Sequence, residues 1–174
     1  MDKVIMGIIG YGNMGSGHTK NIYKGKCPEV ALTAIADINP ERLAAAAELL
    51  PGVKTYDTAE ALLESGEVDA VIIATPTDSH ASIIADALRA GKHVLCEKPP
   101  ALKWQDAQES ERIAEETGKV LMYGFCCRYF RDDPALAGTV YPPDAWHSFQ
   151  CVRIPNDWAA ACARWFFSDR WLEA

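Results

Sequence analysis

The chain has 174 residues, of which 49% are hydrophobic and 24% charged, a composition typical of soluble globular proteins. This length allows one full domain and part of a second. The net charge of −7 argues against nucleic acid or an anionic membrane surface as a partner, because both attract basic proteins.

Apolar runs alternate with helical patterns over most of the chain. We predict six strands, at Val4–Ile9, Val30–Ala36, Val53–Tyr56, Ala70–Ala74, His93–Glu97 and Val120–Tyr123. We predict helices at Asn13–Lys24, Pro40–Leu50, Ala59–Glu64 (capped by Thr58), Ser79–Ala90 and Lys103–Thr117. Parallel neighbours need crossovers, and right-handed crossovers cover both faces of a sheet. The pattern therefore predicts an α/β fold with a doubly wound parallel sheet over residues 1–125.

Residues 126–174 show no sustained helical or strand period, and they hold four of the five tryptophans. We interpret them as a linker and the first strands of a second sheet. So many large apolar groups are costly to leave in water. We expect this segment to be poorly ordered or covered by a partner chain, and the protein to be a homo-oligomer.

The six cysteines show neither Cys-x-x-Cys pairing nor zinc-like spacing, so we predict free thiols, several of them buried in strands, and no metal site. No apolar run is long enough to span a bilayer. The first ten residues lead directly into a glycine motif and do not resemble a signal peptide. These features favour a cytoplasmic protein without a membrane partner.

The segment Gly10–Gly15, G-Y-G-N-M-G, follows the first predicted strand and opens a helix. In this pattern Gly10 permits a tight turn, Gly12 lets the backbone approach a pyrophosphate, and Gly15 lets helix and strand pack closely. The helix amino terminus offers free N–H groups to phosphates. We therefore predict a dinucleotide site that includes Tyr11, Asn13 and Met14. A glycine turn without a ligand is the alternative.

Asp37 ends the second predicted strand, close to the spacing at which an acid binds the adenosine ribose hydroxyls. A carboxylate there repels a 2′-phosphate, which favours NAD over NADP. Arg42 is near enough in sequence to soften that preference. The structural alternative is that Asp37 only caps the helix beginning at Pro40.

The segment Ala74–Pro99 reads as strand, loop, helix and strand, and it places Thr75, Pro76, His80, Glu97 and Lys98 near the carboxyl ends of two strands. Ligands bind at those ends in parallel α/β sheets. For His80, a ligand contact and a role at its own helix terminus are both open. For Glu97 and Lys98 the alternative is a surface ion pair. We interpret His18 and His93 as structural residues.

Together the Gly10–Gly15 motif, Thr75-Pro76 with His80, and Glu97-Lys98-Pro99 resemble the Gfo/Idh/MocA family of nicotinamide-dependent oxidoreductases. The resemblance covers about Val4–Arg128. It implies that Lys98 faces the nicotinamide and holds the substrate hydroxyl. Desolvation beside a positively charged nicotinamide would lower the pKa of this lysine and suit it to proton transfer. It also implies that Glu97 supports the cofactor or its loop, and that His80 lies beside the nicotinamide ribose and diphosphate.

The chain departs from the family pattern at two positions just before Arg128 and again in the residues after it. Gly124-Phe125-Cys126-Cys127-Arg128 has cysteines where similar proteins carry asparagine and arginine, so a substrate contact by Arg128 stays open. The Asp/His pair that supplies the general base in similar proteins does not occur. The chain stops at Ala174, and the second α/β substrate domain of the family is largely missing from it.

The resemblance implies a dehydrogenase that moves hydride between NAD and a hydroxyl carbon of a sugar, polyol or related small molecule. We expect the 174 residues alone to bind the cofactor without turnover. A second interpretation is a non-catalytic NAD-binding module that senses redox state or regulates a partner. A third is a soluble domain whose glycine motif has lost its ligand.

Overall fold

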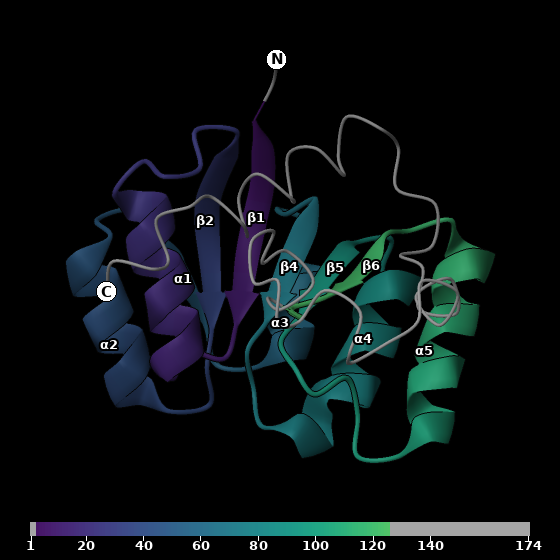
Figure 1. The fold of residues 1–174 in the computed structure, drawn as a ribbon. Helices are drawn as coiled ribbons and strands as arrows, with labels where there is room; N and C mark the ends of the chain where they lie inside the picture. Colours follow the sequence, from purple (N-terminus) through teal and green to yellow (C-terminus); the bar gives the residue numbers. More distant parts are fainter. Residues whose placement is uncertain (1–2, 126–174) are drawn as a thin grey trace, which may run out of the picture.

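A computed structural model describes residues 3–125, which form one six-stranded sheet with helices on both faces (Figure 1). The strands are β1 (Val4–Ile9), β2 (Val30–Ala36), β3 (Lys54–Tyr56), β4 (Ala70–Ile73), β5 (His93–Cys96) and β6 (Leu121–Tyr123). The helices are α1 (Asn13–Tyr23), α2 (Pro40–Leu49), α3 (Ala59–Glu64), α4 (His80–Arg89) and α5 (Trp104–Thr117), with a short 3-10 turn η1 (Thr77–Ser79). Each bound lies within one residue of its prediction.

The strand order is β3-β2-β1-β4-β5-β6, and every pairing is parallel. This confirms the predicted doubly wound sheet. The order reverses between β1 and β4, which are neighbours in space although β2 and β3 separate them in sequence. In open parallel sheets the crevice for a ligand forms at this point.

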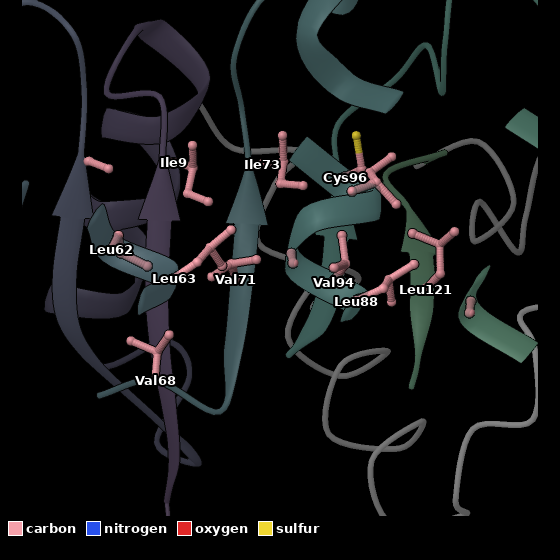
Figure 2. Close-up of a cluster of buried hydrophobic side chains, with 14 of the residues drawn as sticks. Ile9, Leu62, Leu63, Val68, Val71, Ile73, Leu88, Val94, Cys96 and Leu121 are labelled. Carbon is pink, nitrogen blue, oxygen red and sulfur yellow. The ribbon is translucent and has the colours of Figure 1, made fainter. Parts of the chain in front are cut away.

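Alternate residues of the strands pack into two apolar layers, one on each face of the sheet. Ile8 and Ile72 face the layer under α1 and α2, while their chain neighbours Ile9 and Ile73 face the layer under α3, α4 and α5. Figure 2 shows the second layer, where strand side chains meet Leu62 and other helix residues. This two-sided burial explains why the central strands read as continuous apolar runs.

The carboxyl ends of all six strands are level with one another. Their last residues share one register row: Tyr56, Ala36, Ile9, Ile73, Cys96 and Tyr123. The residue after each of the last five donates its backbone N–H to a carbonyl of a neighbouring strand. These next residues are Asp37, Gly10, Ala74, Glu97 and Gly124. Residues far apart in the sequence are thus brought onto a single edge of the sheet.

The predictions for residues 126–174, including those for Arg128, the tryptophans, the second domain and self-association, lie outside the described residues. Among residues 3–125, no helix is both long enough and apolar enough to cross a membrane.

Candidate cofactor and substrate site

The three glycines of the Gly10–Gly15 loop meet different surroundings. Gly10 has a φ of +93°, and a Cβ there would lie 2.8 Å from the peptide joining Ala74 to Thr75. A Cβ on Gly15 would overlap the Gly10 carbonyl oxygen. Above Gly12 the space is open, since the nearest atom to a Cβ would be the Arg42 guanidinium nitrogen at 3.9 Å. Gly10 and Gly15 are therefore needed by the fold, whereas Gly12 leaves room for a ligand.

The amino terminus of α1 borders this open space. Gly12 is its N-cap residue, no side chain caps the helix, and its first turn contains no acidic residue. The first N–H groups of a helix have no acceptor within the helix, and the helix dipole adds positive potential there. Asn13 and Met14 are exposed beside them. This terminus has the donors that a pyrophosphate requires.

Tyr11 behaves differently from its neighbours in the loop. Its side chain is only 7% exposed and packs in the α1–α2 layer, and burial raises the pKa of its phenol. Its backbone N–H, by contrast, points to the site and donates to Asp37 Oδ2 at 2.6 Å. Any contribution of Tyr11 to cofactor binding therefore runs through its main chain.

Asp37 follows β2 and ties the glycine loop to the start of α2. Besides Tyr11, the backbone N–H of Asn39 donates to its Oδ1 at 2.8 Å. Asn39 itself caps α2 by accepting a hydrogen bond from the Glu41 N–H at 2.9 Å. The alternative in which Asp37 caps this helix is therefore wrong. A carboxylate offers about four acceptor positions, so capacity for ribose hydroxyls remains.

Two residues beside Asp37 have properties that the sequence did not reveal. The half-exposed Arg42 guanidinium lies 3.5 Å from Asp37 Oδ2. The same group is also the nearest neighbour of a Cβ built on Gly12. Ile38 is 89% exposed. A large, exposed aliphatic side chain next to a buried carboxylate is suited to pack against the flat face of an adenine ring. The sequence did not indicate a role for Ile38, because a single isoleucine after a strand fits no motif.

Thr75 and Pro76 form the turn after β4. Thr75 is half-buried, and Pro76 is exposed. The Ser79 hydroxyl lies 2.8 Å from both Thr75 Oγ1 and the Pro76 carbonyl oxygen, which fixes the turn from within. Gly10 touches this same turn. The glycine loop and the Thr75 turn therefore meet across the switch point between β1 and β4.

His80 begins α4, but its side chain does not open onto the site. It is 1% exposed, with Nδ1 at 2.8 Å from the Pro99 carbonyl oxygen and Nε2 at 2.9 Å from the Thr75 carbonyl oxygen. Both ring nitrogens are thus occupied by backbone acceptors. The imidazole joins the turn after β4 to the turn after β5.

Glu97 is buried, and Lys98 beside it is exposed. Glu97 Oε1 lies 2.8 Å from His18 Nε2, and its Oε2 accepts a hydrogen bond from the Lys98 N–H at 3.3 Å. The surface ion pair considered for Glu97 and Lys98 is therefore wrong for Glu97, whose partner is a buried histidine. The structural role predicted for His18 is confirmed, although its partner lies 79 positions further along the chain.

A further titratable group near the strand ends is the thiol of Cys96. Burial raises the pKa of the Cys96 thiol, and the neighbouring Glu97 carboxylate acts in the same direction. Cys96 is a free cysteine, as predicted. It faces the α3–α5 layer and not the edge of the sheet.

The residues present fit a dinucleotide. An open cradle above Gly12, an uncapped helix terminus and an acceptor at Asp37 follow one another along a single edge. Lys98 stands two strands away from Gly10 on the same edge. Pyrophosphate and ribose therefore each have a chemically matched group.

Residues 4–125 match the model of the oxidoreductase family with an NAD-binding Rossmann fold, GFO_IDH_MocA. The chain belongs to this family. This match confirms the resemblance inferred from the motifs. It also confirms the predicted Rossmann fold and the predicted cofactor, NAD.

Two curated proteins are each about a third identical to the chain in sequence. The rhizopine catabolism protein MocA of Rhizobium meliloti is 35% identical over 81% of the chain and 46% of its own length. The myo-inositol 2-dehydrogenase of Thermotoga maritima is 35% identical over 78% of the chain and 40% of its own length. The chain thus spans less than half of each.

Among solved structures, the scyllo-inositol dehydrogenase of Lactobacillus casei with bound NAD(H) and scyllo-inositol superposes with a TM-score of 0.70. It is 27% identical, and the match covers 75% of the chain and 38% of that structure. The shared part is the Rossmann domain described above.

Proposed function

We propose that the chain is the cofactor-binding part of an NAD-dependent dehydrogenase that oxidises a hydroxyl carbon of a cyclic polyol or sugar. The observation that carries this proposal is the position of Lys98. It is exposed at the end of β5, on the edge that also holds the open glycine loop and the buried Asp37. A cation beside a dinucleotide cradle is suited to bind a hydroxyl oxygen.

The cofactor residues divide along this edge. The N–H groups at the start of α1 would bind the pyrophosphate, and Asp37 would accept hydrogen bonds from the adenosine ribose. The exposed Ile38 would pack against the adenine. Thr75 and Pro76 would border the ribose on the nicotinamide side, in the turn that touches Gly10. NAD, when bound, supplies the acceptor for the hydride.

Lys98 would handle the proton of the substrate hydroxyl. As a hydride leaves the carbon, the hydroxyl must lose its proton, or a high-energy cation forms. The Lys98 Nζ orients the oxygen by a hydrogen bond and, in its amine form, takes that proton. General acid–base help of this kind is worth roughly a hundred- to ten-thousand-fold in rate.

The substrate class rests on the relatives. The Thermotoga protein is named for myo-inositol, and the Lactobacillus structure contains scyllo-inositol together with NAD(H). Both are cyclic polyols, whose hydroxyl carbons are suited to hydride transfer. We therefore propose a cyclic polyol or a sugar for the protein to which this chain belongs.

Two measurements test the proposal. Calorimetric titration of the chain with NAD should show binding at one site, and loss of Lys98 in Lys98→Ala should leave most of that affinity. NADH formation is then followed with a panel of polyols and sugars, using the chain and any longer product of the same reading frame. Turnover that Lys98→Ala abolishes supports the dehydrogenase. Binding without turnover in the longer product favours the redox-sensing module instead.

A further inference from the structure

Two buried histidines reach the segment Glu97–Pro99 from opposite sides of the sheet. His18 comes from α1, and His80 comes from the first position of α4. Each is 1% exposed. Because α1 and α4 pack on different faces, the two rings approach the end of β5 from opposite layers.

On the α1 side the contact is made through a side chain. Strand residues alternate between faces, and Cys96 faces the α3–α5 layer, so Glu97 turns toward α1. There its carboxylate meets His18 at 2.8 Å. A buried carboxylate that loses such a partner is strongly unfavourable. His18 thus fixes the residue immediately before Lys98.

On the α4 side the contact is made through the backbone. His80 lies within hydrogen-bond distance of the carbonyl oxygens of Pro99 and Thr75. The imidazole therefore lies between two carbonyl oxygens, one from the turn after β4 and one from the turn after β5. His80 thus fixes the residue immediately after Lys98 and ties it to the Thr75 turn.

We propose that His18 and His80 are positioning residues that clamp Lys98 between two anchored neighbours. The proposed catalytic role of Lys98, on which the purpose of this clamp rests, requires a flexible side chain on a rigid backbone. Lys98 is exposed and free to meet a ligand, while residues 97 and 99 are held from beneath. The clamp also joins α1, the turn after β4 and the turn after β5 into one unit.

The test measures the Lys98 backbone by ¹⁵N relaxation. A rigid backbone gives an order parameter of about 0.85, and a flexible one falls below about 0.6. We expect Lys98 to fall from the first value toward the second in His80→Gln, which can hold only one carbonyl well. We expect the same in the double variant His18→Leu/Glu97→Leu, which replaces the buried pair by apolar groups and so avoids an uncompensated charge.

His93→Gln is the matched control. His93 begins the same strand, and its Nδ1 accepts a hydrogen bond from the Val120 N–H at 3.1 Å, at the opposite edge of the sheet. This variant should leave the Lys98 order parameter unchanged. If Lys98 stays equally rigid in both clamp variants, the proposal is wrong. Because the relaxation measurement needs neither cofactor nor turnover, it is independent of whether the proposed dehydrogenase activity exists.

Discussion

The edge formed by the amino ends of the strands and the edge formed by their carboxyl ends differ in which polar and apolar side chains they bury. At the amino edge, Asp69 accepts a hydrogen bond from the Ile5 N–H, and Lys54 pairs with Glu67 in contact with water. At the carboxyl edge, Asp37 and Glu97 are nearly inaccessible. The large apolar side chains Met14 and Ile38 stand in water there, 44% and 89% exposed.

We interpret this reversal as the difference between a structural edge and a ligand-binding edge. Folding alone favours apolar groups inside and charges outside, as at the amino edge. Burying carboxylates and exposing aliphatic groups lowers stability, so a protein keeps such an arrangement where a ligand will use it. The predictions that follow test this contrast, beginning with the largest expected effect.

Gly12→Val should abolish NAD binding while leaving the fold intact. The Gly12 backbone is extended, with a φ of −78°, and no atom lies closer than 3.9 Å to an added Cβ, so the side chain fits the free protein. It fills the space proposed for the pyrophosphate. Calorimetric titration should show no binding, with a circular dichroism spectrum like that of the parent chain.

Gly15→Val and Gly17→Ala are the controls. A Cβ on Gly15 collides with the Gly10 carbonyl, and overpacking of this kind costs about 1–3 kcal/mol or more, so this variant should unfold at a lower temperature. Gly17 has open space around it and should tolerate alanine. Normal NAD binding by Gly12→Val would place the cofactor elsewhere.

Asp37→Ser should narrow the preference for NAD over NADP by roughly 10-fold, equivalent to about 1.4 kcal/mol. The substitution removes the charge that repels a 2′-phosphate, and it leaves Arg42 free to meet that phosphate. Titrations with both cofactors give the ratio. Arg42→Ala should move the ratio in the other direction. An unchanged ratio in Asp37→Ser would refute the ribose assignment.

His93 should make stability depend on pH. Burial lowers the pKa of His93 below its ordinary value of 6.5, and Lys119 acts in the same direction against a smaller opposing effect of Asp69. The unfolded chain therefore binds a proton that the folded chain does not. Stability from this group is fully present above pH 6.5 and is lost as the pH falls through the folded value.

Urea unfolding at about pH 7.5 and about pH 5.5 measures this loss. His93→Gln keeps an acceptor for the Val120 N–H but does not titrate, so the difference in stability between the two conditions should shrink. NAD affinity should stay the same, because His93 lies at the amino edge. An undiminished pH dependence in His93→Gln would assign the effect to other groups.

Lys54→Gln should have the smallest effect. The Lys54–Glu67 pair is largely exposed, and exposed ion pairs contribute little because water screens them and ordering the side chains costs entropy. We expect no measurable change in the unfolding temperature or in NAD affinity. A clear fall in NAD affinity or in the unfolding temperature would contradict the assignment of the amino edge to a structural role.

Local signals predicted the fold well because they act over a few residues. Thr58 caps α3 as expected, and Gly118 ends α5 in the left-handed conformation that favours glycine. The separate roles of Gly10 and Gly15 also followed from their place between strand and helix. These features depend on neighbours in the chain.

The clamp around Lys98 could not be predicted in the same way. His18 and Glu97 belong to different motifs, and only the strand order brings them together. The sequence also gave no reason to expect both nitrogens of His80 to meet backbone carbonyls. Contacts of this kind depend on the register of the sheet. The sequence indicated the residues that gather at this edge, but not which of them hold and which remain free to bind.

The strand order has a consequence for the growing chain on the ribosome. β1 is made first, yet one of its two neighbours is β4, which is complete only at Ile73. Until then β1 and β2 form a sheet with an unpaired edge and an apolar surface where β4 will lie, and such edges recruit other chains. The crevice that a dinucleotide would enter therefore forms only after translation has passed Ile73.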